Sequence, residues 1–225
     1  MQVLFKVKLN EKYFLRDPET SRIGRKIIFS SVELIEKLGI EAFTFKKLAS
    51  EINTTEATIY RYFENKHNLL VYLTSWYWAM LEFQIDYSTA NINDANLKLT
   101  KVIEVLLNNI KDNTTTENFN EELLRKIIIS ESSKSYLTKD VDKENKEGFF
   151  YYYKSLCKKI ASILLEINPN YKYPRALAIS LIENTYNQLY FADHLPSLTD
   201  LNSEKKDLTI ISGFLETMVI GSLKG

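Results

Sequence analysis

The side chains best suited to chemistry gather between positions 43 and 70, where hydroxyl, phenol and guanidinium groups lie close together along the chain. Such groups donate the hydrogen bonds that phosphate oxygens and the edges of nucleic-acid bases accept. Nine residues are candidates for a nucleic-acid interface, most of them through such donors: Thr44, Thr55, Glu56, Ala57, Thr58, Tyr60, Arg61, Tyr62 and Lys66.

Catalytic groups are scarce in this sequence. The chain contains two histidines, His67 and His194, and a single cysteine, Cys157. It has no glycine-rich phosphate loop, no His-Glu-x-x-His motif and no nucleophile elbow. His67 has no second histidine or carboxylate at metal-ligand spacing, so a capping or surface position is expected for it. We therefore expect no catalytic residue, no metal site, no cofactor and no enzyme activity.

The candidate residues are placed by two short predicted helices and a tight turn. The first helix is expected from Phe45 to Ile52, with Thr44 as its N-cap. Residues 53–55, Asn-Thr-Thr, break the helical period, since asparagine tolerates the left-handed conformation and Thr55 can cap the next helix. The second helix, about residues 55–62, is expected to bury Ile59 and Phe63 and to expose its polar side chains. Periodicity alone leaves open an ordinary helical hairpin or a DNA-reading helix-turn-helix.

Clear boundary signals flank this stretch. Residues 17–19, Asp-Pro-Glu, predict the start of a helix that runs to Leu38, and Gly39 stands where a left-handed residue ends a helix. Asn65 is expected to cap a further helix that continues to about Tyr87.

The order of these motifs resembles the TetR/AcrR family of bacterial transcriptional regulators. The resemblance covers residues 23–70 and stands in the segments LIEKLG (34–39), TIYRYF (58–63) and NKHNLL (65–70). It implies a three-helix DNA-binding domain, a phosphate contact from Lys66, and dimerisation through the last two helices. The usual Gly-Val-Ser turn of the family is Asn-Thr-Thr here. Glu56 stands where the family often has a base-contacting residue, so this carboxylate either accepts from a cytosine amino group or points to solvent.

Composition is that of a globular protein without a membrane segment. The chain of 225 residues is 45% hydrophobic and 26% charged, with no net charge. Residues 1–70 carry 12 Lys or Arg against 9 Asp or Glu, whereas residues 71–225 carry 17 against 20, so the small basic excess lies with the predicted DNA-binding part. No apolar run of membrane-spanning length and no signal peptide occurs, and the lone Cys157 indicates a core thiol in a reducing compartment. A cytoplasmic protein is expected.

The predicted fold is all-α, with about nine helices. We expect an N-terminal arm at residues 1–16, a helix-turn-helix domain at 17–65 and a helical effector-binding and dimerisation domain at 66–225. The arm is either a solvated tail or a segment that brushes DNA. Five helices are expected in the third part, near 95–111, 117–134, 145–167, 173–193 and 204–222. The last two are apolar on more than one face, which predicts a homodimer interface.

The aromatic content of residues 71–225 favours a small-molecule pocket over a catalytic site, although aromatic side chains at helical spacing are also typical of a core. The candidate effector-pocket residues are Trp76, Met80, Phe83, Tyr152, Asn184 and Gln188.

These patterns together predict a ligand-responsive repressor that binds a palindromic, double-stranded DNA operator as a homodimer. The partners expected are the operator and a small-molecule effector. Two alternatives stay open at this point: a DNA-binding activator or architectural protein without an effector, and an all-helical small-molecule binding protein or enzyme with a vestigial DNA-binding head.

Overall fold

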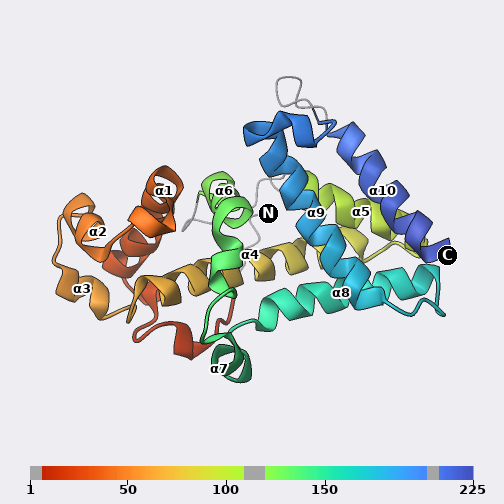
Figure 1. The fold of residues 1–225 in the computed structure, drawn as a ribbon. Helices are drawn as coiled ribbons and strands as arrows, with labels where there is room; N and C mark the ends of the chain where they lie inside the picture. Colours follow the sequence, from red (N-terminus) through yellow and green to blue (C-terminus); the bar gives the residue numbers. More distant parts are fainter. Residues whose placement is uncertain (1–6, 109–119, 202–207, 225) are drawn as a thin grey trace. The chain divides into compact units, whose positions relative to one another are not determined.

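The computed structural model describes residues 7–108, 120–201 and 208–224. All regular elements in these ranges are helical, which confirms the all-α prediction (Figure 1). No described helix is long and apolar enough to cross a membrane. The α-helices are α1 (Arg22–Ala42), α2 (Phe45–Glu51), α3 (Glu56–Tyr60), α4 (Lys66–Thr89), α5 (Ala95–Asn108), α6 (Glu121–Glu131), α7 (Val141–Lys146), α8 (Tyr151–Ile167), α9 (Pro174–His194) and α10 (Thr209–Lys224).

The chain forms two compact units. The first consists of Met1–Trp78 and Asp112–Tyr151, and the second of Ala79–Lys111 and Tyr152–Gly225. Helix α4 begins in the first unit and ends in the second. The compact units group the α6 and α7 segments with the N-terminal helices, so they do not coincide with the functional domains expected to divide at residues 16 and 65. That functional division stays a prediction.

In the first unit, α1 packs against α6 (Figure 1). Helix α1 buries an aliphatic stripe that includes Ile27, Ile28 and Ile35. This helix begins later than predicted, because Pro18–Thr20 forms a separate 3-10 turn and the Ser21 side chain accepts from the N–H of Gly24 as the true cap. Gly39 takes the left-handed conformation that was predicted, with φ of 73°, and α1 is assigned beyond this kink to Ala42.

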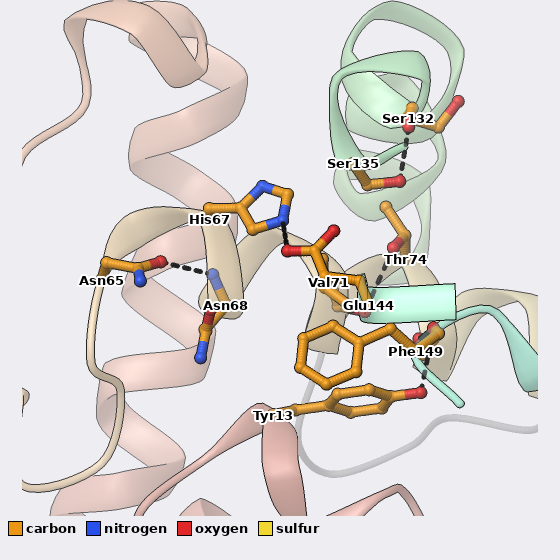
Figure 2. Close-up of polar contacts among 11 residues, drawn as sticks. Tyr13, Asn65, His67, Asn68, Val71, Thr74, Ser132, Ser135, Glu144 and Phe149 are labelled. Atoms are coloured by element: carbon orange, nitrogen blue, oxygen red, sulfur yellow. Dashed lines mark hydrogen bonds and ion pairs between the residues drawn. The ribbon is translucent and has the colours of Figure 1, made fainter. Parts of the chain in front are cut away.

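The described part of the predicted arm is packed against the first unit. Tyr13 is completely buried, and its hydroxyl donates to the carbonyl of Phe149 at 3.0 Å (Figure 2). Leu9 is also buried, and the Asn10 side chain donates to the carbonyl of Glu147 at 2.8 Å. A solvated tail is therefore the wrong description of residues 9–13, since contacts distant in sequence hold this stretch in place.

The helix predicted at 145–167 corresponds to α8, which begins later, at Tyr151, whereas residues 145 and 146 belong to the end of α7. The chain turns between these two helices at Gly148, which has φ of 85°, a conformation that favours glycine. The carbonyls of Gly148 and Phe149 lie outside regular helix here and accept from the Tyr13 hydroxyl. The apolar stripe on which the prediction rested begins only at Phe149, since residues 142–148 are polar or glycine, so the predicted start at 145 lies before the stripe.

The second unit contains α5, α8, α9 and α10. The buried face of α10 is built by Ile211, Leu215 and Val219, which repeat every fourth residue. Polar contacts join the helices of this unit: the Lys98 amine lies 2.5 Å from a Glu166 carboxylate oxygen, and the Asn168 side chain donates to the carbonyl of Leu223 at 2.7 Å.

Candidate nucleic-acid interface

Helices α2 and α3 are joined by a short turn whose backbone is set by Asn53. This asparagine has φ of 54°, the left-handed conformation predicted for it. The N–H of Thr54 then donates to the carbonyl of Ala49 at 2.9 Å, which closes the end of α2. The turn is thus held by backbone hydrogen bonds.

Threonine hydroxyls cap both helices. Thr44 Oγ1 accepts from the N–H of Lys47 at 3.2 Å, and Thr55 Oγ1 accepts from the N–H of Thr58 at 3.3 Å. The Thr55 and Thr58 hydroxyls also hydrogen bond to each other at 3.0 Å. Because α3 has only five residues, it has few internal hydrogen bonds, and the N-cap hydrogen bond contributes a large part of its stability.

The inner faces of the two helices form one apolar cluster. Ile59, Phe63 and Leu48 are completely buried, and the Tyr60 ring meets Phe45 edge to face at 5.1 Å. The inward positions of Ile59 and Phe63 confirm the predicted orientation of the second helix. This packing leaves the other side of α3 facing outward.

The outward side of α3 presents polar groups. Glu56, Ala57 and Arg61 are exposed, and the Tyr60 side chain retains 48% exposure despite its contact with Phe45. Among the described residues no carboxylate forms an ion pair with Arg61. Thr44 and Thr55 are also exposed, whereas Thr58 is half-buried. An exposed phenol beside an unpaired guanidinium gives this face the hydrogen-bond donors that phosphates and base edges accept.

Tyr62 does not belong to the outward face, so its expected outward position is wrong. Its side chain is 1% exposed, its hydroxyl lies 2.7 Å from Ser21 Oγ, and the Arg16 guanidinium lies over its ring. Both contacting residues, Arg16 and Ser21, precede α1 in the chain. Tyr62 therefore positions α3 against the start of α1.

Lys66 is occupied within the protein. Its amine donates to the carbonyls of Ile40 at 2.8 Å and Glu41 at 3.0 Å, at the end of α1. Those carbonyls form the negative end of a helix dipole, which a cation stabilises. The predicted phosphate contact of Lys66 stays a prediction, and the structure adds a positioning role for its amine.

Sequence reasoning missed Glu131, on α6, as a residue that supports the helix-turn-helix. One carboxylate oxygen accepts from the N–H of Ile40 at 3.2 Å, directly after the kink at Gly39, and the other lies 2.6 Å from the Lys134 amine. The hydrogen bond to Glu131 is the main cause that raises the pKa of the Lys134 ammonium. No local sequence pattern predicts this contact, because its two partners are 91 residues apart in the chain.

His67, expected at a cap or on the surface, is half-buried and lies 2.7 Å from a Glu144 carboxylate oxygen (Figure 2). Asn65 is the predicted cap of α4, and its side chain accepts from the N–H of Asn68 at 2.8 Å (Figure 2). In the described ranges, no cluster of three or more His, Cys, Asp or Glu residues could hold a metal ion.

The six residues predicted for an effector pocket lie in different environments. Trp76 and Met80 are buried, whereas the other four are half-buried. The Gln188 side chain accepts from the Thr199 hydroxyl at 2.6 Å, and the Asn184 side chain donates to the carbonyl of Ser180 at 2.8 Å. A cavity found near the N-terminus is lined by none of the six. Their role in binding an effector stays a prediction.

The fold and the capped turn define a class, that of all-helical proteins that carry a helix-turn-helix. Residues 27–73 match the model of the family described as bacterial regulatory proteins, tetR family. This match confirms, for residues 27–73, the resemblance that the motifs predicted. No curated protein sequence matches the chain.

Solved structures share the fold. One is the fatty acid degradation regulator FadR from Bacillus halodurans, 15% identical over 87% of this chain and 97% of that chain, with a TM-score of 0.60. A TetR-family transcriptional regulator from Agrobacterium tumefaciens is 19% identical over 89% and 98%, with a TM-score of 0.57. AibR in complex with isovaleryl coenzyme A and operator DNA is 16% identical over 86% and 97%, with a TM-score of 0.55.

Proposed function

We propose that this protein is a sequence-specific transcriptional repressor that binds a palindromic operator as a homodimer and leaves it when a small molecule binds. The observation that carries the proposal is the outward face of α3, where Tyr60 and Arg61 are exposed on a helix held by a capped turn. The family match over residues 27–73 supports the same function. A repressor acts on the chromosome, so its place in a bacterium is the cytoplasm.

The DNA contacts follow from this face. Helix α3 has five residues and is about 7.5 Å long, and a recognition helix in the major groove contacts base edges through its N-terminal residues. We assign base-edge contacts to the first turn of α3, where Glu56 and Ala57 lie, and phosphate contacts to the hydroxyl, phenol and cationic groups around it. The full set is Thr44, Thr55, Glu56, Ala57, Thr58, Tyr60, Arg61 and Lys66.

A dimer is supported by the second face of α10. Ile210 and Phe214 are 46% and 45% exposed on the side away from the buried stripe of this helix. Between them, Gly213 has no atom within 4 Å of the place where a Cβ would stand, so a second helix can approach closely there. An apolar face of this kind is stabilised by burial, and we assign it, with α9, to the subunit interface. Two-fold symmetry then presents two copies of α3 to successive major grooves, about 34 Å apart.

Release from DNA requires an effector that binds one dimer state better than the other. AibR was solved with both isovaleryl coenzyme A and operator DNA, and this neighbour supports a small-molecule effector for the present chain. Helix α4 is the covalent route for the signal, because it runs without interruption from the first unit into the second.

The experiment that tests this function is selection of binding sites from a randomised duplex pool with the full chain. We expect a palindrome to be enriched, with an affinity that falls steeply as salt rises. The double variant Tyr60→Ala, Arg61→Ala should lose operator binding by about a hundredfold, since each contact contributes about 1–3 kcal/mol.

The matched control is Tyr173→Ala, Lys172→Ala, which removes an exposed phenol and an exposed cation from the segment before α9. It should bind as the unaltered protein does. If no sequence were enriched at any salt concentration, or if the two double variants bound equally well, the assignment of α3 to DNA would be overturned.

A further inference from the structure

The residues before α1 form a strap, defined here as Val7–Ser21, that is held at both ends within the first unit. Near its start, Asn10 and Tyr13 hydrogen bond to the carbonyls of Glu147 and Phe149. Near its end, the N–H of Leu15 donates to the carbonyl of Tyr62 at 2.8 Å. The strap thus contacts both the turn before α8 and the residues that follow α3.

A cavity of about 430 Å³ lies between this strap and α4. Its volume is within the range of about 300–1,000 Å³ that is usual for small-molecule sites. Of the described lining residues, all belong to the strap except Tyr72, which belongs to α4. Val7, Leu9 and Phe14 supply apolar surface, so the cavity has an apolar part as well as a polar part.

The polar part of the cavity is acidic. Its described lining residues include three carboxylates, those of Glu11, Asp17 and Glu19, and a single cation, Lys8. The Asp17 carboxylate accepts from the N–H of Glu19 at 2.9 Å, so its position is held by the turn it caps.

An aromatic wall stands beside these carboxylates. The rings of Phe14 and Tyr72 meet edge to face at 6.1 Å, and the Tyr72 hydroxyl donates to Glu19 at 3.1 Å. Burial, together with the charge of Glu19, raises the pKa of Tyr72, so the phenol stays neutral and continues to donate. Aromatic faces attract cations through the ring quadrupole, and carboxylates attract them through charge.

We propose that the cavity under the strap is a binding site for a small organic cation with an apolar body, such as a protonated arylalkyl amine. The ammonium group contacts the carboxylates of Glu19 and Asp17, and the apolar body lies against Phe14 and Leu9. This site is separate from the six residues predicted to form the effector pocket, and it does not depend on DNA binding.

The test uses three probes that share a phenylethyl body and differ in charge: phenethylamine, 2-phenylethanol and 3-phenylpropionate. Binding to the full chain without DNA is followed by amide chemical shifts, which also locate the site. We expect saturable binding of phenethylamine with shifts at Phe14 and Tyr72, at least about tenfold weaker binding of the alcohol, and none of the anion.

Two variants and one control separate the effect of the carboxylate charge from the effect of the cavity volume. Glu19→Gln keeps an acceptor for the Tyr72 hydroxyl but removes a charge, and should weaken phenethylamine binding about tenfold. Val7→Phe fills the cavity with all carboxylates intact, and should abolish binding. Glu33→Gln removes an exposed carboxylate of α1 and should leave binding unchanged.

Absence of saturable phenethylamine binding at millimolar concentration would overturn the proposal. Equal binding of the three probes, or binding that survives both Glu19→Gln and Val7→Phe in folded protein, would overturn it as well.

Discussion

Replacing Lys66 by methionine separates two roles that the sequence and the structure assign to this residue. The resemblance of the motifs predicts a phosphate contact, whereas the structure shows the amine donating to the carbonyls of Ile40 and Glu41. Methionine keeps most of the length and apolar character of the stem and removes the charge and the donors.

The magnitude follows from these two hydrogen bonds. Hydrogen bonds to a charged group contribute about 1.5–3 kcal/mol, and the half-buried position of Lys66 argues for the lower end. A loss of about 1.5 kcal/mol lowers the melting temperature by about 3–6 °C in a chain of this size. If the amine acts only within the protein, operator affinity falls while the slope of log K against log salt stays the same.

The assay is thermal unfolding by circular dichroism, combined with operator titration at several salt concentrations. Lys37→Met, which removes an exposed lysine of α1 that has no ion pair among the described residues, is the control and should change neither quantity. A phosphate contact would instead lower the salt slope by about one. An unchanged melting temperature together with a lower slope would refute the positioning role.

Three further predictions concern single side chains. Tyr62→Phe removes the hydroxyl that hydrogen bonds to Ser21, so we expect unfolding to become easier by about 1 kcal/mol in a denaturant titration, with an unchanged salt slope for operator binding. Gly24→Ala would place a Cβ 2.2 Å from a backbone carbonyl oxygen and should destabilise the chain by about 1–3 kcal/mol. The control Glu33→Ala, at an exposed position of the same helix, should change the stability by less than about 0.5 kcal/mol, and equal melting temperatures of the two variants would contradict this reasoning. Burial raises the pKa of the Cys157 thiol, which reduces its thiolate fraction at neutral pH, so alkylation by iodoacetamide should be slower than for glutathione, and its rate should rise with pH at higher values than the glutathione rate does.

Local sequence determined the elements around the turn. Thr44, Thr55 and Asn65 cap the helices that they were predicted to cap, and Asn53 and Gly39 adopt the left-handed conformations predicted for them. Each of these features depends on a side chain and a backbone group within a few residues of each other, so residue type and spacing are sufficient to predict it.

Only the tertiary structure decided which polar side chains are exposed and which are buried or bonded within the protein. Tyr62 and Tyr60 are the same residue type two positions apart, yet one is buried against Ser21 and the other is exposed. The carbonyl partners of Lys66, the contact of Glu131 with Ile40 and the packing of Tyr13 join residues that are far apart along the chain. Helical periodicity describes one helix at a time, and these contacts form only when several elements meet in space.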